Sequence, residues 1–195
     1  MNVKVLLGIG LIAGLFFYGV SVNNSLVNAE ENVNQSWAQV ENQYQRRADL
    51  IPNLVNTVQG AADFESETLN EVIEARSRAT SVEIDAEDLG NPEMLQQFQE
   101  AQQQLSGALS RLLVTVERYP ELQANQNFRD LQVQLEGTEN RISTERMRFN
   151  QAVQSYNASL RQFPRNMLAG VLGFESKAYF EADEGSEEAP EVEFD

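Results

Sequence analysis

The chain has 195 residues and a net charge of −16 at pH 7, and this length suits one well-packed domain. It contains no cysteine and no histidine, which excludes disulfides, thiolate nucleophiles, a lipid-modified N-terminal cysteine, imidazole bases and most transition-metal sites. The negative charge argues against nucleic acid or anionic lipid headgroups as the main partner, because both would repel the protein.

The N-terminal segment predicts a membrane anchor. Residues 5–22, VLLGIGLIAGLFFYGVSV, carry no charge over 18 residues, at the short end of what spans a bilayer. Lys4 precedes this run, and Glu30 and Glu31 follow it. By the positive-inside rule, the N-terminus is cytoplasmic and the rest of the chain lies outside the cytoplasm of the cell.

A cleaved secretory signal peptide is the alternative to a retained anchor. Residues 27–29, Val-Asn-Ala, place small side chains where a signal peptidase cuts, so cleavage near Ala29 would release the protein. We favour retention because a helical pattern begins near Val27 and continues past this point. The sequence therefore predicts a single pass through the cytoplasmic membrane.

A long helix follows, with a proline inside it. Residues 46–55, RRADLIPNLV, place Pro52 within an apolar stripe that keeps its phase, so we expect a kinked helix; a break at 50–52 is the alternative. The proline removes the bond to the Ala48 carbonyl and costs about 3 kcal/mol, which packing must offset. The stripe comprises Val33, Trp37, Val40, Tyr44, Ala48, Ile51, Val55, Val58 and Ala62.

Two further helices and an acidic loop come next. Asp63 can cap a helix that reaches about Val82, and residues 83–91 form the loop. Asn91-Pro92-Glu93 is a strong helix start, and Tyr119-Pro120 ends that helix before a connector over 121–125. Its inward positions are Met94, Phe98, Ala101, Leu105, Leu109, Leu112 and Val116, and glutamines 96, 97, 99 and 102–104 face mostly outward.

The last long helix has an unbroken 3.5-residue period. Its seam positions are Phe128, Leu131, Leu135, Thr138, Ile142, Glu145, Phe149, Val153, Tyr156, Leu160 and Phe163. Such a period predicts an all-α fold, with an antiparallel bundle of about four long helices behind the transmembrane helix. Residues 164–180 predict a short helix and a segment folded back on the bundle. We divide the chain into an anchor over 1–23, a bundle domain over 24–180 and an acidic, disordered tail over 181–195.

Polar residues on two seams predict a buried layer. Arg47 lies at the edge of the first stripe, Thr138 and Glu145 occupy seam positions, and Glu139 and Arg146 flank them. A half-buried arginine needs a carboxylate, so we expect Arg47 to pair with Glu139 or Glu145. Such a layer fixes the register of a bundle; a functional site built on the same groups is the alternative.

No catalytic, cofactor or metal site is predicted. The sequence has no P-loop, GxGxxG or GxSxG, no ExxH for a di-iron centre, and no EF-hand glycine or terminal glutamate in the acidic loop. The aromatic residues near the seams predict core packing, with a ligand slot between helices as the alternative. These residues are Trp37, Tyr44, Tyr119, Phe149 and Tyr156.

Four motifs taken in order resemble the LemA family. They are RRADLIPNLVNTV at 46–58, RYPELQANQNF at 118–128, LEGTENRI at 135–142, and YNASLRQFP at 156–164 with GF at 173–174. The resemblance covers about 24–180 and implies a bacterial, membrane-held helical bundle without established enzymatic activity or agreed catalytic residues. It also places the proline motif inside the first long helix, which favours the kink. Some members look like lipoproteins, and this cysteine-free chain departs from that variant.

The predicted function is therefore a non-catalytic scaffold or adaptor in the cell envelope, with the membrane and a protein as partners and no nucleic acid. The alternative is a helical sensor or ligand-binding module that uses a slot near Arg47 and the 138–146 seam. A hydrolase has the least support.

Overall fold

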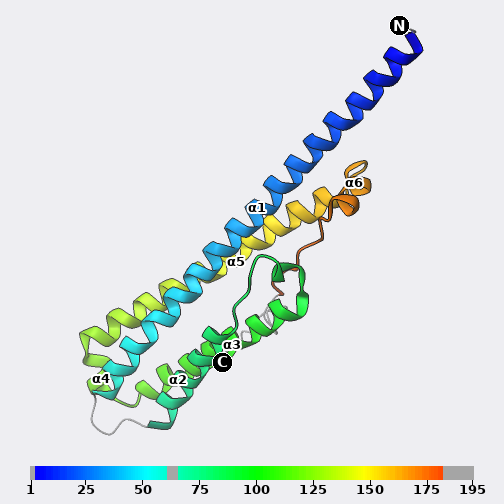
Figure 1. The fold of residues 1–195 in the computed structure, drawn as a ribbon. Helices are drawn as coiled ribbons and strands as arrows, with labels where there is room; N and C mark the ends of the chain where they lie inside the picture. The colour runs from blue at the N-terminus through cyan, green and yellow to red at the C-terminus, as the bar shows by residue number, and fades with distance from the viewer. Residues whose placement is uncertain (1–2, 61–65, 182–195) are drawn as a thin grey trace, which may run out of the picture.

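The computed structural model describes residues 3–60 and 66–181. These residues form helices and connecting segments without a strand, so the predicted all-α fold is confirmed (Figure 1). The elements are α1 (Val3–Gln59), α2 (Ser66–Ser81), the 3₁₀ helix η1 (Asp88–Gly90), α3 (Pro92–Val116), α4 (Pro120–Ala124), α5 (Gln126–Arg161) and α6 (Arg165–Leu172).

The bundle consists of two antiparallel helix pairs. The long helix α1 packs along α5, and the shorter α2 packs along α3 (Figure 1). The N-terminal part of α1 projects beyond the end of α5 as a single helix. The two pairs share one end of the molecule, where α4 turns the chain from α3 back into α5.

Pro52 lies inside α1, which is helical on both sides of it. The continuous helix was expected from the phase of the apolar stripe, and the alternative of a break at 50–52 is wrong. The kink itself stays a prediction.

The core has two apolar clusters along the bundle. The near cluster, on the side of the projecting N-terminal helix, contains Val22, Leu26, Trp37, Phe149 and Tyr156 among others. The far cluster contains Leu54, Val72, Leu105, Leu112 and Phe128 among others. On α1 the near cluster ends at Tyr44 and the far cluster begins at Ile51, so Arg47 lies between them.

Several local expectations are corrected. The connector after Tyr119 contains the short helix α4, with Pro120 at its first position, where a proline needs no amide. Phe163, expected on the seam, lies beyond the end of α5 and is exposed. The acidic loop includes η1. Asn91 caps α3 as expected, its side chain accepting from the amides of Glu93 and Met94. Asp63, Ala62 and residues 182–195 of the predicted acidic tail lie outside the described residues.

Residues 174–181 return along the bundle as an extended strap, as expected for a segment folded back. Two asparagines of α5 bind its backbone with paired hydrogen bonds. Asn157 binds both backbone groups of Lys177 at 2.8 and 3.0 Å, and Asn150 binds those of Phe180 at 2.9 and 3.0 Å. The strap therefore joins α5 to the η1 region, where the Ala178 amide donates to the Leu89 carbonyl at 2.8 Å.

Candidate functional site

A buried arginine lies at the centre of the bundle. The side chain of Arg47 is 2% exposed and its Nη1 donates to Glu139 Oε2 at 2.8 Å and to Ser106 Oγ at 2.8 Å. Its Nη2 donates to Gln102 Oε1 at 2.7 Å. One guanidinium thus joins α1, α3 and α5 at the boundary between the two apolar clusters.

Of the other residues in the predicted polar layer, all of which the structure describes, only Glu139 bonds Arg47. Thr138 is buried next to Glu139 in sequence, and its hydroxyl donates to the Gln134 carbonyl of its own helix at 2.7 Å. Of the two carboxylates expected for Arg47, the structure places Glu139 there, while Glu145 accepts from Arg148 at 2.7 Å.

Arg146 takes part in a different contact, at the strap. Its Nη2 donates to the Glu181 carbonyl at 3.0 Å, and its guanidinium lies 4.9 Å from the centre of the Phe180 ring. The sequence therefore grouped residues that the structure divides between the Arg47 network and the strap. That the Arg47 network fixes the register of the bundle stays a proposal.

Two partners of Arg47, Ser106 and Gln102, were missed from the sequence. Gln102 is buried, and its amide donates to the Ala79 carbonyl at 3.0 Å while its side-chain oxygen accepts from Arg47. We expected this glutamine to face outward, and that expectation is wrong, as it is for Gln99, which bonds the Glu181 carbonyl at 3.0 Å. The available signal was spacing, because Gln102 stands four residues after Phe98 on the same helix face.

A small slot opens beside Arg47 between α3 and α5. Its volume is about 290 Å³, and leucines 109, 113 and 135 line it together with Arg47 and Glu139. Thr138, Glu145 and Arg146 do not line it. The predicted ligand slot therefore has a counterpart next to Arg47 but does not extend along the 138–146 seam.

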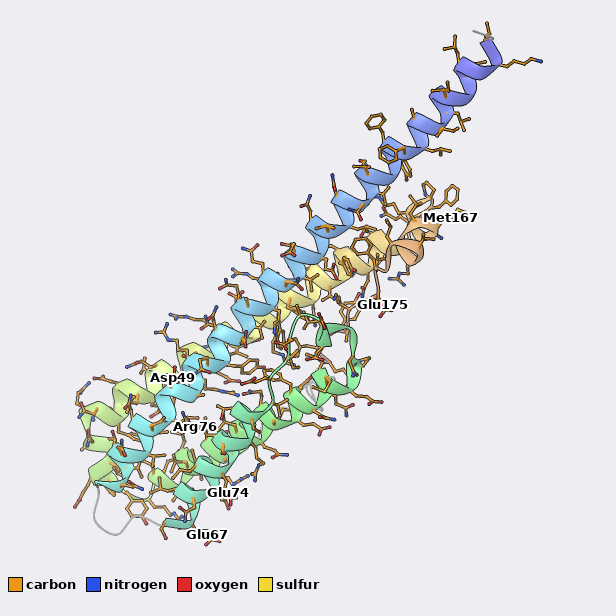
Figure 2. All side chains as sticks on the ribbon, in the orientation of Figure 1. Asp49, Glu67, Glu74, Arg76, Met167 and Glu175 are labelled. Atoms are coloured by element: carbon orange, nitrogen blue, oxygen red, sulfur yellow. The ribbon has the colours of Figure 1, made fainter. Side chains whose placement is uncertain are left out.

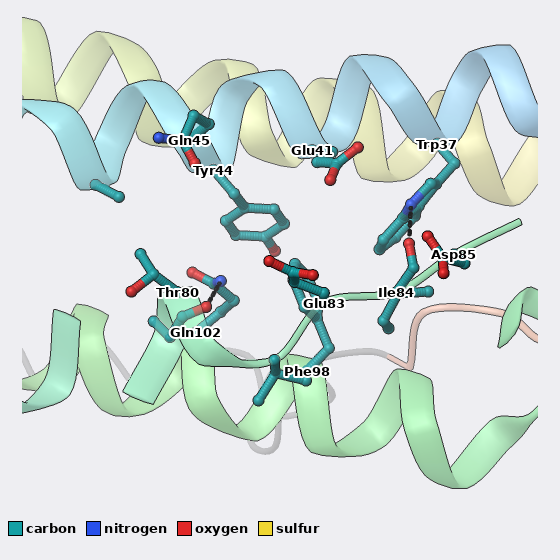
Figure 3. A pocket seen from close by; sticks show the side chains of 13 residues that line it. Trp37, Glu41, Tyr44, Gln45, Thr80, Glu83, Ile84, Asp85, Phe98 and Gln102 are labelled. Atoms are coloured by element: carbon teal, nitrogen blue, oxygen red, sulfur yellow. Dashed lines mark hydrogen bonds between the residues drawn. The ribbon is translucent and has the colours of Figure 1, made fainter. Parts of the chain in front are cut away.

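A second cavity of about 170 Å³ lies between α1, α3 and the loop after α2. Figure 3 shows Trp37 and Tyr44 projecting from α1 toward this loop, where Trp37 Nε1 donates to the Ile84 carbonyl at 3.2 Å. The cavity lining also includes the carboxylates of Glu41, Glu83 and Asp85 and contains no lysine or arginine. Aromatic rings with nearby carboxylates suit a cation, and the Arg47 guanidinium already lies 5.2 Å from the centre of the Tyr44 ring. A small organic cation would therefore be held mainly by Trp37 and the carboxylates.

The projecting part of α1 has an exposed apolar surface. One helix of the described chain is long and apolar enough to cross a membrane, and it begins near the N-terminus. No side chain of residues 6–21 is buried, although the segment contains leucine, isoleucine and phenylalanine. A bundle core therefore does not account for these residues, whereas lipid contact would.

Comparison with known proteins gives consistent matches. A family model described as LemA family matches residues 36–194. Protein LemA of Metamycoplasma hominis is 22% identical over 175 residues, covering 89% of this chain and 76% of that protein. Magnetosome protein MamQ 2 of Paramagnetospirillum magneticum is 36% identical over 74 residues, and MamQ of Magnetospirillum gryphiswaldense is 34% identical over 73 residues. These two matches each cover 27% of the relative, so the chain spans about a quarter of the length of the magnetosome proteins it matches.

Proposed function

This chain belongs to the LemA family, and from that premise we propose that it is a membrane-anchored, non-catalytic scaffold or adaptor of the bacterial cell envelope. Residues 1–23 anchor the protein, and residues 24–180 form the bundle domain that meets a partner protein. The N-terminus is cytoplasmic and the bundle lies outside the cytoplasm.

The continuity of α1 carries this proposal. The same helix supplies the exposed apolar segment and the longest seam of the bundle, and no linker separates them. A bundle joined to its anchor in this way cannot swivel freely, unlike one on a flexible tether. A rigid connection between anchor and bundle suits a protein that holds a partner at a fixed position relative to the membrane.

The length of α1 sets how far the bundle reaches. Val22 is the first buried residue of α1 after the exposed segment 6–21. The length of α1 from Val22 to its end at Gln59 is about 55 Å at 1.5 Å per residue. The far cluster and α4 therefore lie well away from the bilayer surface. A partner that binds there would be held at that distance.

The amino-acid composition supports both the proposed orientation and the proposed non-catalytic role. Lys4 precedes the uncharged run and Glu30 and Glu31 follow it, which favours a cytoplasmic N-terminus. Without histidine or cysteine, the chain lacks the side chains most often used as bases and nucleophiles near pH 7.

Site-specific photo-crosslinking in native membranes tests the scaffold proposal. A photoreactive residue is placed at exposed bundle positions near the far end, such as Val114 and Gln123, and in the anchor at Leu11 as a control. We expect one protein to be captured from both bundle positions and not from the anchor position. Capture of only lipid or a second copy of the chain would overturn the proposal.

The absence of native cysteine allows a direct test of orientation. A single Val114→Cys variant should react with a membrane-impermeant maleimide in intact spheroplasts, since α3 would lie outside. Labelling that requires permeabilised cells would contradict the proposed orientation. The size of the mature chain, measured in the same samples by mass spectrometry, distinguishes a retained anchor from cleavage near Ala29.

A ligand-binding module is the second candidate function, and the cavity around Trp37 and Tyr44 favours it. We expect a small quaternary ammonium ion to raise the melting temperature of the protein, and Glu83→Gln to reduce that rise. Glu74→Gln, on an exposed part of α2, is the matched control. An unchanged melting temperature at millimolar ligand would remove this function.

A further inference from the structure

The short helix α6 exposes a stripe of large apolar side chains. On α6, Met167 and Val171 are 67% and 84% exposed, and their spacing of four residues places them along one side of the helix. Phe163, which is 80% exposed, lies in the turn just before the helix and adds a third large apolar side chain. On its other side, Ala169 is buried in the near cluster and Leu168 packs against it. The helix is thus held to the bundle by one face while its other apolar face has no partner in the described chain.

This arrangement differs from the rest of the bundle surface. Exposed large apolar side chains elsewhere, such as Ile73, Val114 and Val133, come from three different helices. Isolated apolar residues on a surface need no explanation, whereas a contiguous stripe of them indicates a contact surface. Leu172, 43% exposed, stands four residues after Leu168 and therefore lies on the side of α6 that faces the bundle.

The stripe lies at the point where α1 leaves the bundle. Helix α1 contacts α6, and Val22 belongs to the same apolar cluster as Ala169. Val22 is also the last residue of the apolar run 5–22, after which Asn23 and Asn24 follow, so the level of α6 is the level at which the anchor would emerge from the bilayer. Figure 2 shows Met167 on α6 beside this part of α1.

The charges near α6 suit a phospholipid surface. Arg161 ends α5 and Arg165 begins α6, so two guanidinium groups flank Phe163 in an otherwise acidic protein. Arginines at the edge of an apolar surface can bind lipid phosphates while their stems stay in the interface. The overall negative charge still disfavours attraction to anionic membranes, so contact here depends on apolar burial and on the anchor.

We propose that residues 163–172 form a membrane foot, which inserts its apolar stripe into the interface of the bilayer that α1 spans. This inference rests on the anchor of the proposed function. An interfacial helix of this kind lies in the plane of the membrane with its apolar face among the upper acyl chains. With α1 as one attachment and the foot as a second, the tilt and rotation of the bundle are both restricted.

Depth-dependent fluorescence tests the foot in the full-length protein. Single variants Val171→Cys, Leu11→Cys and Val114→Cys carry a polarity-sensitive fluorophore and are reconstituted into phosphatidylcholine vesicles, with or without bromine at both upper and lower positions of the acyl chains. Leu11 reports the anchor, and Val114 reports an exposed bundle surface. We expect bromine to quench the probes at 11 and 171 at least twofold, and to leave the probe at 114 unchanged.

Each other outcome has a distinct meaning. Quenching at 11 without quenching at 171 would overturn the foot and leave the anchor intact. No quenching at either position would overturn the anchor and the foot together. A blue-shifted but unquenched probe at 171 would show that a second copy or another protein covers the stripe, which also overturns the foot.

A substitution in the stripe gives a second readout. Met167→Glu should abolish the quenching of a probe at 171, because a carboxylate disfavours insertion of this face. Val133→Glu, at an equally exposed apolar side chain on α5, should leave the quenching unchanged. Because both side chains are exposed, we expect both variants to fold, and melting temperatures close to that of the parent protein would show this. Equal quenching in the two variants would overturn the foot.

Discussion

Arg76 Nε donates a hydrogen bond of 2.8 Å to the carbonyl of Ala48. That carbonyl is the acceptor that an amide at position 52 would bond in a regular helix, and Pro52 has no amide hydrogen. An arginine of α2 therefore fills a vacancy that the proline creates in α1. This contact helps to explain how α1 passes through Pro52 without ending, and it joins α2 to α1 at the same point.

The first prediction concerns this compensation. Arg76→Leu should lower the free energy of unfolding by about 1–3 kcal/mol, because it leaves the Ala48 carbonyl without its donor. In a Pro52→Ala background the amide of residue 52 can donate instead, so the same change should cost about 1 kcal/mol less. Urea denaturation of the four proteins in this double-mutant cycle measures the coupling.

Arg78→Leu is the matched control, since Arg78 is an exposed arginine of the same helix that lies 3.7 Å from Glu74. We expect its effect to stay within about 0.5 kcal/mol. Equal costs of Arg76→Leu in the two backgrounds would contradict the proposed compensation.

The course of α1 could be predicted from the sequence, but its support at Pro52 could not. Apolar spacing before and after Pro52 keeps one phase, and phase is what a continuous helix requires. Arg76 stands 28 residues away from Ala48, and no periodicity connects a side chain of one helix with a carbonyl of another.

At the Arg47 site, too, some features could be predicted from the sequence and others could not. The position of Arg47 at the edge of the apolar stripe predicted half burial, and a half-buried arginine needs a carboxylate, for which Glu139 and Glu145 were the two candidates. Glu145 bonds Arg148, three residues along its own helix, and a local partner of this kind competes with a distant one. Gln102 was not found because glutamine is usually exposed, and its burial here depends on Arg47 and Ala79 as partners.

The second prediction tests the burial of Arg47. Arg47→Met should lower the free energy of unfolding by about 2 kcal/mol, since it removes the hydrogen bonds to Ser106, Glu139 and Gln102 and leaves the Gln102 oxygen without this donor. Glu139 is 56% exposed, so water can solvate its carboxylate after the change, which limits the loss. Thermal and urea unfolding provide the measurement.

Arg46→Met is the control for this pair, because Arg46 is the adjacent arginine and is exposed. Its expected effect is within about 0.5 kcal/mol. If both substitutions shift the unfolding midpoint equally, Arg47 does not connect the three helices in the way described.

The third prediction concerns alkaline pH. The pKa of Tyr156 is raised from 10.0 to about 12. Burial is the largest cause, and the negative charges of Glu30 and Glu175 also contribute. In the unfolded chain the phenol loses its proton near pH 10, whereas the folded protein retains it to about pH 12. The contribution of Tyr156 is therefore fully present below pH 10 and is lost as the pH rises toward 12.

Tyr156→Phe isolates this contribution. The hydroxyl of Tyr156 is buried without a hydrogen-bond partner in the described chain, so its removal should change stability little at pH 8. By pH 11 the variant should gain roughly 1 kcal/mol relative to the parent protein. Urea midpoints of both proteins at the two pH values measure the difference, and a difference that does not vary with pH would contradict the prediction.

The fourth prediction concerns the strap and its aromatic residue. Phe180 is buried, and its ring lies 5.8 Å from Trp37 and 5.4 Å from Phe149 between ring centres. Phe180→Ala should therefore lower the free energy of unfolding by about 3–5 kcal/mol. The neighbouring Tyr179 is exposed, so Tyr179→Ala should cost far less and serves as the control.

Hydrogen exchange should show where that loss falls. The amides of Lys177 and Phe180 donate to Asn157 and Asn150, so their protection reports whether the strap stays bound to α5. In Phe180→Ala we expect these amides, and that of Ala178 which bonds Leu89, to exchange much faster, because the asparagines would then hold a strap without its buried side chain. Amides in the middle of the far cluster should keep most of their relative protection, because that cluster does not include Phe180. Uniformly faster exchange across both clusters would instead mean that the bundle unfolds as one unit and that the strap is not a separable element of it.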